Sequence, residues 1–302
     1  MTSTRTRRSV ITLIVLILLM VTMGVAACLI GQVETSLQDI WNTLSSAWGI
    51  TPDTGDTSAV VASTLWEVRF PRIVLALVVG AGLGCAGALL QGIFANPLAE
   101  PGIIGVSSGG AVFAAGLLAI ANLAGIDTSY MFLKWGTAVA AFVGALLTTL
   151  LVYALSRVQG KTIIVNFILV GVAVNALSAG LITLFSFLGG SAAQSQVVFW
   201  QFGSFAGAGW DKAVIALIVT VLGIIGAATQ SRKMDLLALG ENQAQHLGVN
   251  VERFRLLIIA IVAALVGVGV AFAGVIAFVG LVVPHAIRLI IGPQHKWLLV
   301  SS

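Results

Sequence analysis

Long runs without a charged residue constrain this chain more than any other feature. The uncharged runs cover residues 10–30, 73–99, 101–126, 135–156, 162–210, 213–231 and 256–287. The longest run holds one span over about 162–188 and then a polar, Gly-rich segment, and the last run holds one span and the start of another. Because about 20 apolar residues cross a bilayer, we predict an all-α, polytopic bundle of about eight transmembrane helices.

The shortage of charge supports this assignment. Only 9% of the 302 residues are charged, whereas a soluble domain carries about 25%. The bilayer must therefore act as the solvent, and the charges are too few for a nucleic-acid partner. The first apolar run, from Val10 to Ile30, is too long for a signal peptide and is followed by no small-residue cleavage site, so we interpret it as a retained helix.

Basic residues in the loops predict the orientation. Lys and Arg are enriched in cytoplasmic loops. With the N-terminus inside, eleven of the 15 basic residues fall on the cytoplasmic side and four outside. The inner set is Arg5, Arg7, Arg8, Arg157, Lys161, Arg232, Lys233, Arg253, Arg255, Arg288 and Lys296, and the outer set is Arg69, Arg72, Lys134 and Lys212. We therefore expect a cytoplasmic N-terminus.

An internal repeat relates two stretches at an offset of 187 positions. Val79, Gly80, Gly82, Ala86, Gly87 and Pro97 align with Val266, Gly267, Gly269, Ala273, Gly274 and Pro284. The predicted spans place the two copies in opposite directions, and inverted repeats are typical of transporters, with the solute pathway at the repeat interface. Residues 10–188 would form the first half and 213–302 part of the second. The counterparts of 135–156 and 162–188 are absent, so either the sequence is truncated or the second half diverges; we expect truncation by about two helices after Ser302.

Two segments are candidates for function. Residues 96–102 contain Pro97 and Pro101, which break a helix, and Glu100, the only charge between Arg72 and Asp127. They are either a broken element that lines a pathway or a simple interfacial loop. Residues 232–255 form the longest polar segment that faces inward. Asp235 is a candidate cap, and Gly240 and Gly248 are candidate ends, for two short helices that would suit a docking surface; the alternative is a solvated connector.

An ATP-binding site is not evident. Gly160, Lys161 and Thr162 resemble the end of a phosphate-binding loop, but residue 155 is Leu and an apolar helix precedes the motif. The histidines at 246, 285 and 295 are spaced too irregularly for a metal site. We therefore predict a transport subunit without cofactor, metal or catalytic residues, and ATP hydrolysis in a separate protein.

Several motifs, in order from about residue 66, resemble the FecCD-type permease family of ABC importers for iron–siderophore, haem and cobalamin. They are Arg69-Phe-Pro-Arg72, 80–91, 96–102, Gly105-Val-Ser-Ser-Gly109, 199–204 with Trp210, Leu239-Gly-Glu241, Leu247-Gly-Val249 and 274–285 with Arg288. The sequence departs from the family where Ala95 replaces a frequent basic residue and Val275 a usual proline.

The resemblance implies a type II ABC importer fold with ten helices, located in the bacterial cell membrane. It further implies a homodimer or paired permease, cytoplasmic ATPase subunits and an extracytoplasmic solute-binding protein. Arg69 and Arg72 would receive acidic groups of the binding protein, since arginine makes bidentate pairs with carboxylates; the alternative is that both snorkel to the interface. ATPase coupling would involve Leu239, Gly240, Glu241, Ala244, Leu247, Gly248 and Val249. Pathway or hinge residues would be Asn96, Pro97, Glu100, Pro101, Gly102, Gly274 and Pro284.

The cargo expected first is a ferric siderophore, with haem and cobalamin as alternatives. Two readings from other classes stay open. An ion-coupled secondary transporter would place ionisable groups in mid-membrane, and the spans here are almost free of them. A truncated, inactive relative is the second.

Overall fold

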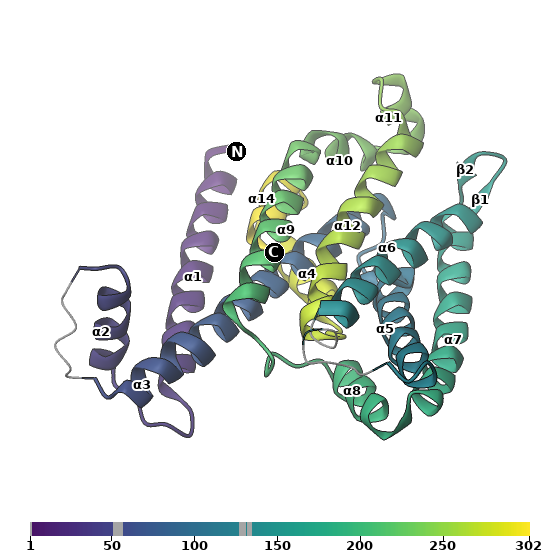
Figure 1. The fold of residues 1–302 in the computed structure, drawn as a ribbon. Coiled ribbons are helices and arrows are strands. Elements are labelled where there is room, and N and C mark those ends of the chain that lie inside the picture. The colour runs from purple at the N-terminus through teal and green to yellow at the C-terminus, as the bar shows by residue number, and fades with distance from the viewer. Residues whose placement is uncertain (1, 51–56, 127–130, 132–134) are drawn as a thin grey trace. The chain divides into compact units, whose positions relative to one another are not determined.

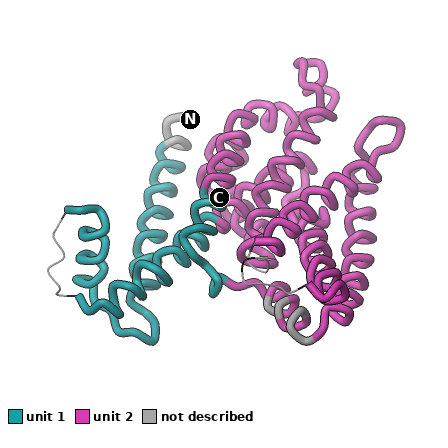
Figure 2. The backbone as a smooth tube through the Cα atoms, in the orientation of Figure 1, with its two compact units in different colours: residues 1–78, 205–217 teal, residues 79–204, 218–302 magenta. Residues whose placement is uncertain are grey.

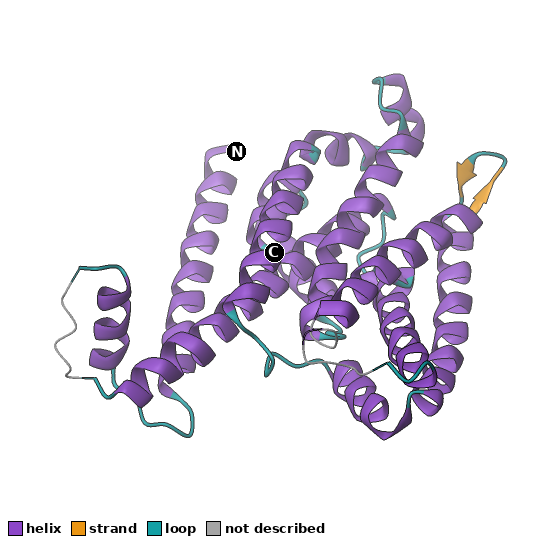
Figure 3. Ribbon diagram, viewed as in Figure 1, coloured by secondary structure: helices purple, strands orange, loops and turns teal. Residues whose placement is uncertain are grey.

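The computed structural model describes residues 2–50, 57–126, 131 and 135–302. Within these ranges the chain is almost entirely helical, apart from one short hairpin (Figure 3). Seven of the described helices are long and apolar enough to cross a membrane, and a shorter apolar helix follows them. The spans are Arg7–Leu29, Ala59–Ile93, Val106–Leu123, Thr137–Leu155, Ile164–Leu188, Trp210–Thr229 and Val251–Ala273, and the shorter helix is Val279–Ile291. The predicted polytopic helical bundle is confirmed.

The chain forms two compact units, which Figure 2 colours separately. Unit 1 comprises residues 1–78 and 205–217, and unit 2 comprises residues 79–204 and 218–302. In unit 1, helix α1 (Thr2–Leu29) is followed by α2 (Leu37–Ala47), α3 (Ala59–Ser63), the π-helix η1 (Thr64–Arg69) and the first part of α4 (Phe70–Ile93). The start of α9 (Trp210–Thr229) also belongs to this unit.

The core of unit 1 is small and aromatic. Cys28, Ile40, Leu65 and Phe70 are buried together, with Trp66 and Trp210 packed against them. The indole of Trp210 donates a 2.7 Å hydrogen bond to the carbonyl of Trp66. Helix α2 begins with a capping box in which Ser36 and Asp39 exchange hydrogen bonds. The hydrogen bonds from Ser36 stabilise the charged form of the Asp39 carboxyl and so lower its pKa.

Unit 2 packs its helices around α5 and α12. After the rest of α4 come η2 (Pro101–Ile104, a 3-10 helix), α5 (Val106–Leu123) and α6 (Thr137–Leu155). The hairpin β1 (Arg157–Val158) and β2 (Lys161–Thr162) follows, and then α7 (Ile164–Leu188), α8 (Gly190–Phe202) and the rest of α9. The unit ends with α10 (Ser231–Leu237), α11 (Glu241–His246), α12 (Val251–Ala273), α13 (Val279–Ile291) and α14 (His295–Ser301) (Figure 1). Helix α5 packs on α6 and α7, and α12 packs on α5 and α6.

The two stretches related by the internal repeat pack against each other in unit 2. The position that a Cβ atom would occupy at Gly82 of α4 lies 3.4 Å from the carbonyl oxygen of Leu265 on α12. The equivalent position at Gly269 of α12 lies 3.1 Å from Val79 on α4. Small residues allow membrane helices to approach closely, so the aligned glycines form the contact between the two copies.

Candidate functional site

The two arginines proposed for docking lie in unit 1 but in different surroundings. Arg69 ends η1, and its side chain is only 8% exposed. Its guanidinium donates to the carbonyls of Cys28 and Val33, and at 2.7 Å to the hydroxyl of Thr35. It therefore binds the C-terminal end of α1 and the segment after it, where unpaired helix carbonyls favour a cation.

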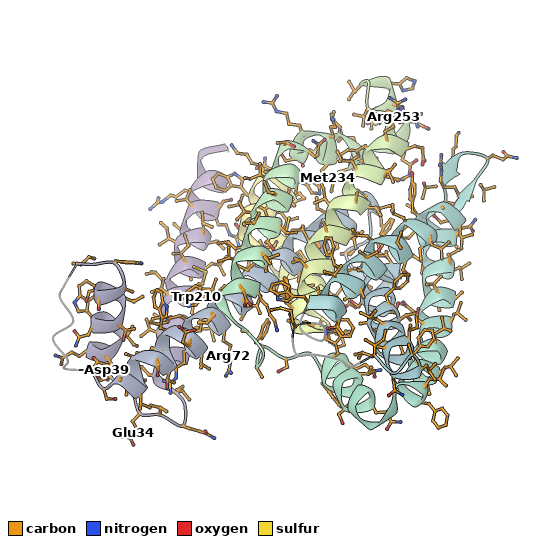
Figure 4. All side chains as sticks on the ribbon, in the orientation of Figure 1. Glu34, Asp39, Arg72, Trp210, Met234 and Arg253 are labelled. Carbon is orange, nitrogen blue, oxygen red and sulfur yellow. The ribbon has the colours of Figure 1, made fainter. Side chains whose placement is uncertain are left out.

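Arg72 lies one turn further along, in the first turn of α4. Its side chain is exposed (Figure 4). No hydrogen bond or ion pair joins Arg72 to another residue in the part of unit 1 that the structure describes. Of the two arginines, Arg72 is thus the one whose guanidinium is accessible to an acidic partner.

The polar segment 232–255 contains two short helices, α10 and α11, as the sequence predicts. Gly240 and Gly248 flank α11 with φ angles of +116° and +86°, which is the region that glycine adopts readily. Ala244 and Val249 are buried, whereas Leu239 and Leu247 are each 60% exposed. Figure 1 shows α11 and the β1–β2 hairpin at the same end of unit 2. The segment thus offers one exposed apolar side chain on each side of the short helix α11.

One predicted detail of this segment is wrong. Asp235 lies inside α10, whose N-cap is Gln230, and not at a cap of that helix; its carboxylate instead binds a distant residue. It lies 2.7 Å from Nδ1 of His295 and 3.2 Å from the backbone nitrogen of His295, at the start of α14. Burial lowers the pKa of the His295 imidazole, although the carboxylate of Asp235 opposes this shift. The pair joins α10 to α14.

A buried arginine joins the segment to the rest of unit 2. Arg255, in the second turn of α12, is 1% exposed. One terminal nitrogen of its guanidinium pairs with the carboxylate of Glu241 on α11. The other lies 3.5 Å from Oε1 of Glu252 and 3.4 Å from the carbonyl oxygen of Thr162. Glu241, which the sequence analysis proposed for ATPase contact, thus also bonds within the subunit.

The break between α4 and α5 has the predicted irregular backbone. Helix α4 ends at Ile93, and the side chain of Asn96 accepts a 2.9 Å hydrogen bond from the backbone of Leu98, a turn that asparagine favours. Pro97 is exposed, and Pro101 is buried at the start of η2. The carboxylate of Glu100 accepts a 3.0 Å hydrogen bond from the backbone nitrogen of Phe278, directly before α13. Glu100 therefore stabilises a helix N-terminus.

A cavity of about 380 Å³ opens beside this break, within unit 2. Its polar lining residues are Glu100, Ser107, Ser108, Asn175 and Gln201. The hydroxyl of Ser108 donates to Oδ1 of Asn175 at 2.6 Å, and the amide of Asn175 donates to the carbonyl of Gly102 at 3.1 Å. Helix α7 is thereby bonded to α5 and to η2 at the cavity wall.

The remaining two predicted hinge residues, Gly274 and Pro284, are not among the residues that line this cavity. Gly274 ends α12 with φ +73°, and a side chain there would meet the backbone carbonyl of Trp200. The indole of Trp200 donates to the carbonyl of Val270 at 2.8 Å, which fixes α8 to α12. Pro284 is buried inside α13. Of the seven proposed pathway or hinge positions, Glu100, Pro101 and Gly102 line the cavity.

Comparison with known proteins identifies relatives over nearly the whole chain. The FecCD transport family matches residues 13–302. A hemin transport system permease protein of Yersinia pestis is 33% identical over 95% of this chain and 81% of its own length. A cobalamin import system permease protein of Halobacterium salinarum is 38% identical over 87% of this chain and 68% of its own length.

The solved structures that share the fold include the following two. The first is an ABC transporter assigned to the metal-chelate type, in an inward-facing conformation. It matches with a TM-score of 0.79 and 31% identity, over 96% of this chain and 84% of that chain. The second, PsaBC from Streptococcus pneumoniae, matches with a TM-score of 0.55 over 80% of each chain. At 17% identity it supports the fold alone.

Proposed function

Because the chain belongs to the FecCD transport family, the membrane permease subunits of ABC importers, we propose that it forms the pathway for a large organic metal chelate. The observation that carries this proposal is the similarity over most of the chain to permeases named for hemin and for cobalamin. Hemin and cobalamin both hold a metal in a macrocycle, and a transporter assigned to the metal-chelate type shares the fold. A ferric siderophore, which the sequence analysis placed first, is a chelate of the same general kind.

The energy for transport would come from a separate ATPase. In this proposal α11 and its flanking residues, Leu239 to Val249, form the docking surface, with the exposed leucines 239 and 247 as apolar contacts. The N-terminus and this segment would lie in the cytoplasm, as the basic residues of the loops predict. Two copies, or one copy and a related permease, would enclose the pathway.

On the outer side, a loaded binding protein would dock on unit 1. The exposure of Arg72 supports a charge-assisted contact there. The cavity beside Glu100 and Asn175 would lie along the route of the cargo, because η2 is an irregular element between two spans and such backbone is tolerated at membrane depth where it lines a cavity. The break between α4 and η2 at Pro97, and the proline at position 284 inside α13, would allow the flanking helices to reorient.

The test compares uptake of three labelled chelates by cells with and without this chain: a ferric hydroxamate siderophore, haem and cobalamin. We expect uptake of one of them to require both this chain and an intact ATPase partner. Deletion of residues 239–249 should release the ATPase from the purified complex and abolish that uptake. Uptake that continues without any ATPase, and stops only when the ion gradient collapses, would instead identify an ion-coupled transporter.

A further inference from the structure

Arg255 carries a charge in one of the most enclosed positions of unit 2. Its side chain is among the largest that are fully buried, at 1% exposure. A buried guanidinium loses its hydration, so it is stable there only if acceptors replace the lost water. The nearby acceptors come from three different places in the chain, so the guanidinium can link several elements.

Two carboxylates and one carbonyl surround the guanidinium. Glu241 is the first residue of α11, Glu252 lies on α12 itself, and Thr162 ends the β1–β2 hairpin. Arginine is suited to such a position because its planar fork can bond to several acceptors at once, which an ammonium group does less well. Arg255 therefore connects α11 with α12 and the hairpin.

Glu252 extends the connection towards α7. Its two carboxylate oxygens accept hydrogen bonds from the backbone nitrogen of Thr162 at 3.0 Å and from the Thr162 hydroxyl at 2.7 Å. Helix α7 begins at Ile164, only two residues later. A continuous chain of bonds thus runs from Glu241 through Arg255 and Glu252 to the start of the helix that carries Asn175 into the cavity wall.

We propose that Arg255 and Glu252 are positioning residues that pass displacements of α11 to α7. The inference rests on the proposed function, in which the ATPase docks on residues 239–249. When the ATPases close on nucleotide, their movement of α11 would reach α12 and α7 as one rigid group and would change the width of the cavity. The residues touch neither ATP nor cargo; they couple the two sites.

Simple attachment of α11 does not require these charges. Ala244 on α11 and Val249 after it are buried apolar residues, so this part of the chain already buries apolar surface. A buried ion pair is often no more stabilising than apolar groups of the same volume. What the charged cluster adds is a directional link between three elements, since each hydrogen bond fixes an orientation as well as a distance.

The decisive variant is Arg255→Lys, tested in the assembled transporter with its ATPase and binding protein in proteoliposomes. It keeps the charge but removes the fork that bonds to both Glu241 and the hairpin. We expect ATPase binding and ATP hydrolysis to persist, while the cargo moved per ATP hydrolysed falls about threefold to thirtyfold, the range for residues that transmit coupling. The matched control is Arg253→Lys, two positions away with an exposed side chain, which should leave this ratio unchanged.

Hydrogen exchange keeps the proposal falsifiable if Arg255→Lys does not assemble. In Arg255→Gln, measured on the purified chain, we expect faster exchange of the amides of α11 and of residues 160–164, because both lose the guanidinium that bonds to Glu241 and to the carbonyl of Thr162, with little change in α5. An unchanged ratio of transport to hydrolysis in Arg255→Lys, or exchange altered in α11 alone, would overturn the inference.

The deletion of residues 239–249 distinguishes failure of this inference from failure of the proposed function. If the ATPase stays bound after the deletion, the proposed docking site itself is wrong. If the deletion releases the ATPase but Arg255→Lys transports normally, only the coupling role is wrong.

Discussion

Arg69 and Arg72 belong to one four-residue motif, yet their side chains meet different surroundings. Arg69 is buried against the end of α1, and Arg72 is exposed. Sequence reasoning assigned both to one docking role because both are cations at the predicted outer edge of a span. A docking role remains a proposal for both, and exposure favours Arg72. The bonds of Arg69 join residues up to 41 positions apart in sequence, a separation that the motif does not encode.

We predict that neutralising Arg69 lowers the stability of the chain, whereas neutralising Arg72 weakens its affinity for the binding protein. Arg69→Gln should lower the free energy of unfolding of the chain in detergent by about 1.5–3 kcal/mol, because a charged donor to three acceptors is lost. Arg72→Gln should change it by less than about 0.5 kcal/mol and should weaken binding-protein affinity, with a salt dependence smaller than that of the unmodified chain. Thermal unfolding and binding titrations at two salt concentrations measure both effects. Equal loss of stability in the two variants would contradict this assignment.

The charged cluster at Arg255 marks the limit of prediction at the scale of single residues. A basic residue near the start of an apolar helix is visible in the sequence, and the sequence analysis counted Arg255 only as an inner loop charge. Its partners Glu241 and Thr162 lie 14 and 93 positions away, so no local pattern reveals them. In contrast, Glu100 could be recognised as unusual because it stands alone in a long uncharged stretch.

At the scale of elements, apolar run length predicts the spans well. Each long uncharged run contains a helix that is able to cross a membrane, since backbone groups in lipid must bond within their own helix. The ends are less predictable, because caps and loop contacts decide them. The polar, Gly-rich stretch after α7 forms α8, held to α12 by the indole of Trp200 and the space left by Gly274. The packing of α8 on α12 depends on contacts between residues far apart in the sequence, so no periodic pattern of apolar residues predicts it.

Two glycines on α7 provide a paired test of its packing. A Cβ atom at Gly171 would meet the carbonyl oxygen of Ile103, whereas none of the described atoms lies within 4 Å of the same position at Gly180. Gly171→Ala should therefore destabilise the chain by about 1–3 kcal/mol, the usual effect of overpacking. Gly180→Ala should be neutral or stabilise it by up to about 1 kcal/mol through helix propensity. Thermal unfolding of the two purified variants compares them directly, and a larger loss for Gly180→Ala would refute the close contact between α7 and η2.

At the scale of the whole molecule, composition and hydropathy already exclude a soluble protein, and family membership establishes a permease. Composition, hydropathy and family membership do not identify the cargo. The cavity has one carboxylate and four neutral polar side chains among its lining residues, and such groups hydrogen-bond to many chelates. In the proposed function, the ATPase and the binding protein would dock on α11 and on Arg72, and the exposure of these surfaces emerges only when the chain folds.

Site-specific crosslinking to a co-produced ABC ATPase tests the central claim most directly. Cys28 and Cys85 are both buried, so single cysteines introduced at exposed positions can be labelled selectively with a bifunctional reagent. We predict that Gln243→Cys on α11 crosslinks to the ATPase in membranes, and that Gln38→Cys on α2 does not. A crosslink from Gln38→Cys without one from Gln243→Cys would contradict both the docking surface and the orientation.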